Sequence, residues 1–224
     1  MTDHLDTSLP DAQPLDSQRL DSLLRRDLLD AVPLAGTARP PVLDGEDVAY
    51  LVDDTAVGRL LLATRSDGVL VASSFAPSDA EADATLDRLA RTVSARILRR
   101  ATPSLDGVRR QLAEYLAGRR TSFELDLDPV LATGFQRQVL SRLASSVGYG
   151  ERISYGALAT AIGRPSASRA VGAALGANPL CVVLPCHRVV AASGALTGYA
   201  GGLDAKRLLL DLEAARDPDQ PRRT

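Results

Sequence analysis

The stretch Leu180-Cys-Val-Val-Leu-Pro-Cys-His-Arg188 brings a cysteine and a histidine together after an apolar, β-branched run. Such a run predicts a buried strand, with Cys186 and His187 on a tight turn that follows it. The thiolate is the reactive form of cysteine, and only a small part of an ordinary thiol is ionised at neutral pH, so a nearby base or cation is needed. The stretch therefore predicts nucleophilic cysteine chemistry.

Composition is that of an ordinary globular protein. The chain has 224 residues, 45% hydrophobic and 24% charged, enough for one or two domains with a sizeable core. It has no apolar run of about 18 residues and no signal-peptide pattern, so we expect no membrane segment and a cytoplasmic location. Its two cysteines, Cys181 and Cys186, make no disulfide framework, and a reducing compartment would keep both as thiols.

The net charge of −2 conceals an uneven distribution. Residues 1–44 carry eight aspartates and four arginines, whereas residues 135–207 carry eight basic and two acidic residues. The basic segment contains Cys186, which makes a polyanion such as nucleic acid a reasonable partner. The alternative is that these arginines only keep the surface soluble.

Proline, glycine and changes of composition divide the chain into four parts. We expect an acidic extension with a short helix and a Pro/Gly linker at 1–45, domains at 46–128 and 129–215, and a tail at 216–224. In the first domain, two β-rich runs flank Ser66-Asp-Gly68, which predicts a hairpin. The rest of that domain is predicted to hold helices over 79–99 and 105–118 and an alternating strand over 123–128.

The second domain is predicted to be mainly helical. Helices are expected over 135–143, over 155–162 with Ser154 as the N-cap, and over 167–177, the last two forming a helix-turn-helix pattern. On the helix over 167–177, one side carries Val171 and Leu175 with Ser168 and Ala174, and the other carries Arg169, Gly172, Ala173 and Gly176. Each helical glycine costs about 1 kcal/mol relative to alanine. Close approach of a partner and tight packing inside the protein explain this bare face equally well.

Several segments occur in order at characteristic spacing: Ser154-Tyr-Gly-Ala-Leu-Ala, Ser168-Arg-Ala-Val-Gly, Asn178-Pro179, Pro185-Cys-His-Arg-Val-Val, Gly198-Tyr-Ala-Gly-Gly-Leu-Asp-Ala-Lys206 and Leu209-Leu-Asp-Leu-Glu213. With them, residues 135–213 resemble the DNA-binding, active-site domain of the O6-alkylguanine-DNA alkyltransferases, or methylated-DNA–protein-cysteine methyltransferases. Gly58-Arg-Leu-Leu-Leu-Ala and Glu114-Tyr-Leu-Ala-Gly-Arg-Arg resemble the family's N-terminal domain. The implied fold class is α/β: a ribonuclease-H-like domain, then a mainly α winged helix-turn-helix-like domain.

The resemblance implies a nucleophile, a base and an orienting group. Cys186 would attack the alkyl carbon on guanine O6 and keep the alkyl group as a thioether, so each molecule would react once. His187 would act through a water as the base, Glu213 would orient His187, and Asn178 would tie the active-site turn. No cofactor and no metal are expected. Taken alone, Glu213 also fits a solvated acid at a helix end, and Asn178 a helix cap.

The same resemblance implies a pocket for the alkylated base. Tyr155 would donate a hydrogen bond to N3 of the leaving guanine, although a lone tyrosine is more often a core aromatic. The pocket would be lined by Pro185, Val189, Tyr199 and Ala200, with backbone N–H groups near Val189 and Ala200 holding the base edge. Many family members have serine at the position of Ala200, which leaves the substrate range open.

The implied partner is double-stranded DNA containing alkylated bases, O6-alkylguanine and also O4-alkylthymine. Because the target atom is buried in the duplex, the base must be flipped out. The helix over 167–177 would enter the minor groove, only about 6 Å wide, and Arg169 would fill the gap left by the flipped base. The backbone would approach closely through small residues: Ala167, Ala170, Gly172, Ala173 and Ala177. A monomer is expected, and cooperative binding to DNA is left open.

Departures from the family pattern are few. Leu140 stands where the family usually has tryptophan, which is a packing change. Some relatives bind zinc in the N-terminal domain, but His4 and Cys181 are the only spare candidates here, so no such site is expected. Cys181 is interpreted as a buried strand residue. Residues 1–44 contain no second methyl-accepting cysteine, which excludes a phosphotriester-repair domain.

Three alternatives compete with alkyl transfer. A non-enzymatic, lesion-sensing relative would bind damaged DNA, but such proteins lack the cysteine that Cys186 supplies. A thiol redox enzyme or cysteine hydrolase would leave the helix-turn-helix and Arg169 without a role. A transcription regulator would need long polar side chains on the second helix to read bases in the major groove.

Overall fold

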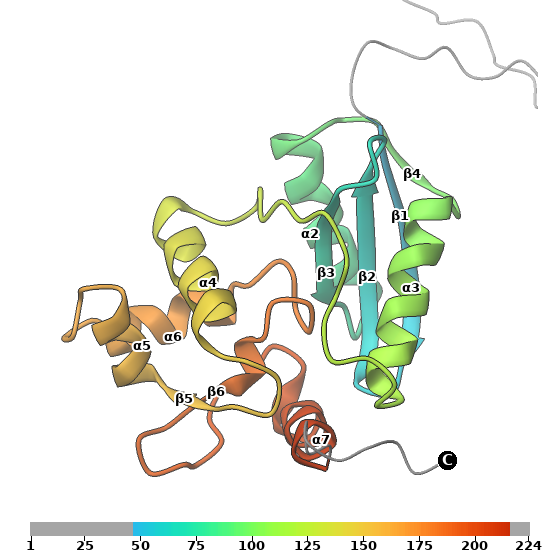
Figure 1. Ribbon diagram of the computed structural model, residues 1–224. Coiled ribbons are helices and arrows are strands. Elements are labelled where there is room, and N and C mark those ends of the chain that lie inside the picture. The colour runs from blue at the N-terminus through green and yellow to red at the C-terminus, as the bar shows by residue number, and fades with distance from the viewer. Residues whose placement is uncertain (1–46, 216–224) are drawn as a thin grey trace, which may run out of the picture. The chain divides into compact units, whose positions relative to one another are not determined.

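The computed structural model describes residues 47–215. The acidic extension at 1–45, with its expected short helix and linker, and the tail at 216–224 lie outside these residues. Within them, the structure has a sheet-containing first part and a helical second part (Figure 1). The predicted fold class, α/β followed by mainly α, is confirmed.

Four strands form the sheet of the first part, in the order β3-β2-β1-β4. Strands β1 (Val48–Thr55), β2 (Gly58–Arg65) and β3 (Leu70–Phe75) are antiparallel, and β4 (Ile97–Arg99) pairs parallel to β1. The hairpin predicted at Ser66-Asp-Gly68 is confirmed, and Gly68 adopts a φ of +93° that favours glycine in the turn. Strand β3 lies at the edge of the sheet, where its outer side is available to another segment.

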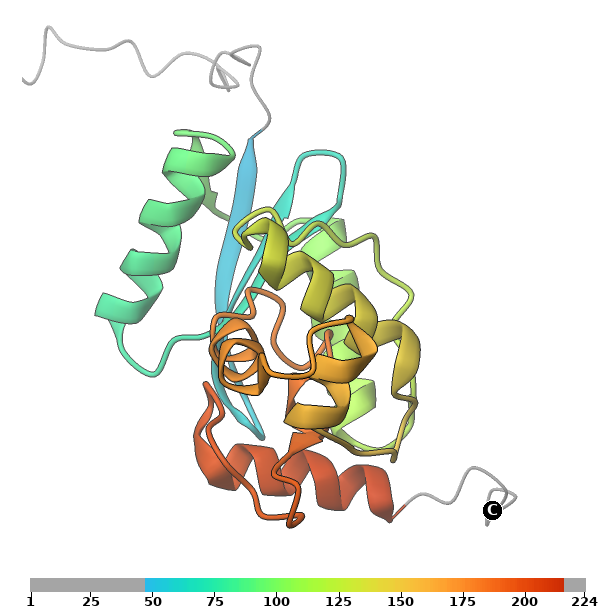
Figure 2. The same ribbon diagram turned by 90° about the vertical axis from the view of Figure 1, so that its left-hand side faces the viewer.

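Successive side chains of a strand point to opposite faces of the sheet, and apolar residues at successive positions explain why helices cover both faces. Leu60 and Leu62 pack with α3 (Pro103–Leu116), while Leu61 and Ala63, one residue out of step, pack with α2 (Asp79–Thr92). Figures 1 and 2 show the two helices on opposite sides of the sheet. All four side chains are fully buried, so the sheet is the centre of this part.

The second part is built from short helices, and several of them surround an apolar core of their own. Its elements are α4 (Gly134–Ser146), β5 (Ile153–Ser154), α5 (Tyr155–Ala161), α6 (Ser168–Gly176), a single 3-10 turn η1 (Cys186–Arg188), β6 (Val189–Val190) and α7 (Gly202–Ala214). Ser154 caps α5 as predicted, because its Oγ accepts a hydrogen bond from Ala157 N at 3.1 Å. The helix-turn-helix pattern is confirmed as α5 and α6. No helix in residues 47–215 is both long and apolar enough to span a membrane.

Three local predictions were wrong. The helix predicted over 79–99 ends at Thr92, and residues 97–99 instead form β4, because pairing with β1 outweighs their helical spacing. The strand predicted over 123–128 is reduced to one bridge between Leu70 and Leu127, since the side chain of Gln111 takes both backbone groups of Glu124. The run Leu180–Leu184 is a tight turn rather than a strand, and Val182 in it has a φ of +70°.

Candidate active site

A loop from Asn178 to Arg188 carries the predicted nucleophile, and Asn178 ties it together. The Asn178 side chain accepts a hydrogen bond from Leu180 N at 3.0 Å and donates to Leu184 O at 3.2 Å. Its Nδ2 also donates to Cys186 Sγ at 3.1 Å. Asn178 therefore holds both the turn and the sulfur that the turn presents.

The edge of the first part's sheet anchors this loop. Ser73 in β3 donates its backbone N–H to Pro179 O at 2.8 Å and accepts from Cys181 N at 2.7 Å, and its Oγ donates to Cys181 O at 2.9 Å. Ser73 is fully buried. Sequence reasoning missed Ser73, because a serine in a strand gives no local sign of a partner 108 residues away.

His187 and Glu213 meet across the base of the loop. Nε2 of His187 lies 2.6 Å from Oε1 of Glu213, and both side chains are at most 1% exposed. Burial lowers the pKa of His187, although the carboxylate acts in the opposite direction, so the imidazole is neutral at neutral pH. The carboxylate partner favours a proton on Nε2. Nδ1 is then the basic nitrogen, and it is buried without a hydrogen-bond partner among residues 47–215.

Glu213 is the centre of a larger buried network. Arg188 donates from Nε to Oε2 at 2.9 Å and from Nη2 to Oε1 at 3.2 Å, and Gly150 N donates to Oε2 at 3.1 Å. The hydroxyl of Tyr115, in α3 of the first part, donates to Oε1. Burial alone would raise the pKa of Glu213, but the hydrogen bonds from His187, Arg188 and Tyr115 lower it to about 2. The carboxylate is therefore charged and satisfied.

Arg188 and Tyr115 are functional candidates that sequence reasoning did not single out. Arg188 follows Cys186 and His187 directly, and its Nη1 also donates to Val147 O at 2.9 Å. The available signal in the sequence was an arginine close to an apolar run, since an arginine that is buried there needs a partner. Nothing local to Tyr115 distinguishes it from a core aromatic, since Glu213 lies 98 residues further on.

Cys186 is 4% exposed and lies among groups that favour its charged form. A hydrogen bond with Cys181 is the largest influence on its pKa, and with the Asn178 amide and the Lys206 charge it outweighs burial, so the pKa is lowered. Lys206 in α7 is fully buried and donates to Val189 O at 2.7 Å and Thr197 O at 2.8 Å. The site therefore combines a nucleophile of lowered pKa with a neutral histidine.

The residues expected to hold the base lie around this loop. Pro185 and Val189 are buried and Ala200 is exposed, while the partly buried Tyr199 packs edge-on to Phe75 with centroids 5.4 Å apart. Val189 N–H closes η1 by donating to Cys186 O, so it is already engaged inside the protein.

Tyr155 begins α5, is partly buried and packs against the apolar core of the helical part. Its hydroxyl donates to Thr197 O at 3.4 Å and accepts from Thr197 Oγ1 at 3.3 Å. A Cβ placed on Gly172 would lie 3.6 Å from the Tyr155 ring. Gly172 therefore brings α6 close to this tyrosine, which links the helix-turn-helix to the loop before α7.

The face of α6 that carries small side chains is exposed to solvent. Val171, Ala174 and Leu175 are buried. Arg169, Ala170, Ala173 and Gly176 are exposed, and Ala167, Gly172 and Ala177 are partly buried. Because four of these positions face solvent, packing against another helix within the described residues does not explain the small residues. Figure 2 shows α5 and α6 together at the front of the view.

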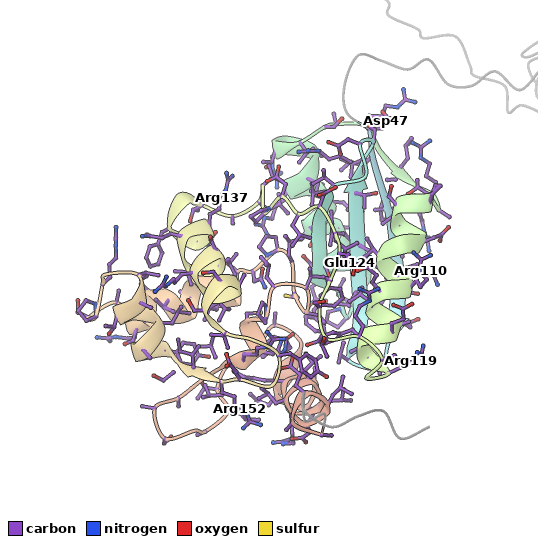
Figure 3. All side chains as sticks on the ribbon, viewed as in Figure 1. Asp47, Arg110, Arg119, Glu124, Arg137 and Arg152 are labelled. Carbon is purple, nitrogen blue, oxygen red and sulfur yellow. The ribbon has the colours of Figure 1, made fainter. Side chains whose placement is uncertain are left out.

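Several basic side chains are exposed on the helical part. Arg142, Arg164 and Arg169 are exposed, as are Arg137 at the start of α4 and Arg152 before β5, both on the outside of the helical part (Figure 3). Residues 47–215 hold no group of three or more histidine, cysteine or acidic residues that could bind a metal ion. The combination of a basic surface, a bare helix and a buried thiol suits an extended anionic substrate.

Comparisons with known proteins agree with this geometry. Residues 134–215 match the family profile described as "6-O-methylguanine DNA methyltransferase, DNA binding domain", and residues 48–129 match its "ribonuclease-like domain". A methylated-DNA–protein-cysteine methyltransferase of Mycobacterium tuberculosis is 51% identical over 108 residues, which is 48% of this chain and 64% of the relative. An inducible one of Bacillus subtilis is 44% identical over 113 residues, 50% of this chain and 62% of the relative. The chain thus spans less than two thirds of these relatives.

Solved structures cover more of the chain. The crystal structure of the Mycobacterium tuberculosis O6-methylguanine methyltransferase is 38% identical, covers 77% of this chain and 96% of its own, and superposes with a TM-score of 0.60. The structure of Mycobacterium tuberculosis OGT in complex with DNA is 40% identical, covers 76% and 96%, and has a TM-score of 0.61. From both parts of the fold together, the chain belongs to the 6-O-methylguanine DNA methyltransferase family.

Proposed function

We propose that this protein repairs DNA by transferring the alkyl group of O6-alkylguanine to Cys186 in a single, irreversible turnover. The observation that carries the proposal is the buried arrangement of Cys186, His187 and Glu213, with Asn178 bonded to the sulfur. The names of the curated relatives support the reaction class. O4-alkylthymine is included as a second substrate.

The chemical step follows from the site. The Cys186 thiolate attacks the alkyl carbon, a carbon–sulfur bond forms, and the carbon–oxygen bond breaks with its electron pair left on guanine. Nδ1 of His187 accepts the thiol proton through a water, and the charged Glu213 stabilises the resulting imidazolium. The thioether has no hydrolysis route, so the protein is consumed.

Departure of guanine requires that its negative charge be reduced. Tyr155 donates to N3 after exchanging its bond with Thr197 O for one with the base. The base lies against Pro185, Tyr199 and Val189, and the N–H of Ala200 holds its edge. The Val189 N–H does not bind the base in this proposal, because it already donates to Cys186 O within η1.

Double-stranded DNA is the proposed partner, bound through the minor groove. The exposed small residues of α6 allow its backbone to approach, and Arg169 fills the space of the flipped nucleotide. The solved complex of the Mycobacterium tuberculosis relative with DNA supports DNA as the partner. Binding should weaken steeply as salt rises, because exposed arginines would contact phosphates.

The remaining parts of the proposal concern organisation. We place the domain boundaries at 46–128 and 129–215, between an extension at 1–45 and a tail at 216–224, supported by profile matches at 48–129 and 134–215. The protein acts as a monomer, without cofactor or metal. It works in the cytoplasm, where its DNA substrate and a reduced thiol would coexist.

The test is intact-protein mass after incubation with a short duplex containing O6-methylguanine. A gain of one methylene mass per chain, absent in Cys186→Ala, is expected. Lesion binding without a gain in mass would replace the proposal with a lesion-sensing role. An unmodified duplex run in parallel separates transfer from adventitious oxidation.

A further inference from the structure

The second cysteine shares the site with the first. Cys181 is 1% exposed, and its Sγ donates to Asn178 O at 3.3 Å, while Nδ2 of the same Asn178 donates to Cys186 Sγ at 3.1 Å. Both cysteines belong to one apolar cluster. One residue therefore contacts both sulfurs, five positions apart in the chain.

The position of Cys181 is fixed from outside the loop. Its backbone N–H donates to Ser73 O at 2.7 Å and its carbonyl accepts from Ser73 Oγ at 2.9 Å. The bridge to Leu184 closes the turn behind it. β3 thus fixes the backbone of Cys181 within the loop that carries Cys186.

We propose that Cys181 is a positioning residue whose thiol donates a hydrogen bond to the sulfur of Cys186 and holds Cys186 as the thiolate. This inference rests on the proposed function, because it assumes that Cys186 is the nucleophile. A thiol is a weak donor, but its hydrogen bond strengthens when the acceptor is charged. With Cys186 neutral, the Cys181 proton points to Asn178 O; with Cys186 ionised, it turns to the sulfur.

The ionisation of the two cysteines agrees with this assignment. The hydrogen bond between the two cysteines is the largest influence on the pKa of each thiol. It raises the pKa of Cys181 and lowers that of Cys186. The proton therefore stays on Cys181 and the charge develops on Cys186. After alkyl transfer, the thioether carries no charge, and the Cys181 proton returns to Asn178 O.

Other charged and titratable groups face Cys186 from the surrounding elements. Lys206 of α7 also favours the thiolate. Tyr199, before α7, stays neutral because burial raises its pKa. Within η1, His187 is neutral and the charge of Arg188 is paired with Glu213. Removal of Cys181 should therefore shift the titration of Cys186 upward without abolishing it.

The test measures reaction of Cys186 with iodoacetamide against pH, followed by intact mass and peptide mapping, which needs no DNA. Cys181→Ala should react about tenfold more slowly near neutral pH, equivalent to one unit of pKa, and its pH midpoint should move upward. Cys181→Ser keeps a donor and should recover most of the loss. If Cys181→Ala does not fold, Cys181→Val provides a larger non-donor that leaves no cavity.

Val183→Ala is the matched control, since it removes buried volume from the same turn but no donor. It should leave the pH midpoint unchanged. An unchanged midpoint in Cys181→Ala, or equal effects of alanine and serine, would overturn the inference. Methyl transfer from the O6-methylguanine duplex is measured separately in the parent chain. A shifted iodoacetamide profile without such transfer would support the role of Cys181 and reject the proposed function.

Discussion

Replacing Glu213 by glutamine removes the charge at the centre of the buried network while keeping its shape. The carboxylate accepts hydrogen bonds from His187, Arg188, Tyr115 and Gly150. A glutamine has one accepting oxygen, and its NH2 group would face donors that previously met the second oxygen. Arg188, whose side chain is 9% exposed, would lose its counter-charge.

The loss of stability should be large. Removing one partner of a buried ion pair costs about 3–5 kcal/mol, because the remaining charge is buried and unpaired. The pKa of Glu213, lowered from 4.5 to about 2, gives an independent figure of about 3 kcal/mol at neutral pH. Glu213→Gln should therefore lower the free energy of unfolding by about 3 kcal/mol.

The same reasoning predicts a pH dependence. The lowered pKa of Glu213 means that its contribution is complete above pH 4.5, the ordinary value, and is lost as pH falls towards 2. The parent chain should lose stability over this range, whereas Glu213→Gln has no carboxyl group to protonate. The difference between the two chains should shrink as pH falls.

Urea unfolding from pH 7 to pH 3 measures both effects, with Glu124→Gln as the matched control. Glu124 has a side chain that is 83% exposed, so its amide variant should change stability by less than about 0.5 kcal/mol. Methyl transfer by Glu213→Gln, followed by intact mass, should slow by about 10²-fold because His187 loses its orienting charge. A loss below 1 kcal/mol in Glu213→Gln, or a pH-independent loss, would refute the reasoning.

Three further predictions follow from single contacts. Tyr115→Phe removes the hydroxyl that joins the two parts of the fold and should cost about 1–3 kcal/mol in urea unfolding; no change would mean that Glu213 is satisfied without it. Arg169→Ala should weaken lesion-duplex binding in fluorescence anisotropy and slow methyl transfer, while the reactivity of Cys186 with iodoacetamide stays the same. If iodoacetamide reactivity fell together with methyl transfer, Arg169 would instead act at the thiol. Gly201→Ala would place a Cβ against the Phe75 ring. This overpacking should lower the free energy of unfolding by about 1–3 kcal/mol, measured by thermal unfolding, and Phe75→Leu in the same chain should relieve part of the loss.

The sequence predicted local structure correctly where residues close together in the chain decide it. Ser154 caps α5 and Gly68 turns the β2–β3 hairpin, because both effects act within a few residues. The spacing of Val171 and Leu175 identified the buried side of α6. The roles assigned to Cys186 and its companions came from the family resemblance, not from periodicity.

Predictions failed where a distant partner outweighed local preference. Residues 97–99 continue a helical spacing but pair with β1, and Glu124 binds the Gln111 side chain instead of joining a ladder. The apolar run Leu180–Leu184 has strand composition, yet it folds into a turn held by Asn178 and Ser73. Short apolar runs are ambiguous because their periodicity fits several structures.

By itself, then, the sequence determined that Cys186 and His187 are consecutive and that a helix with small side chains on one face precedes them in the chain. Only the tertiary structure decided that Ser73 fixes the loop, that Tyr115 reaches Glu213, and that Asn178 contacts the sulfurs of both Cys181 and Cys186. These contacts depend on where the edge of the sheet and α3 lie against the helical part. Such placement is set by the packing of whole elements, since hydrogen bonds across about 100 residues leave no pattern in the local chain.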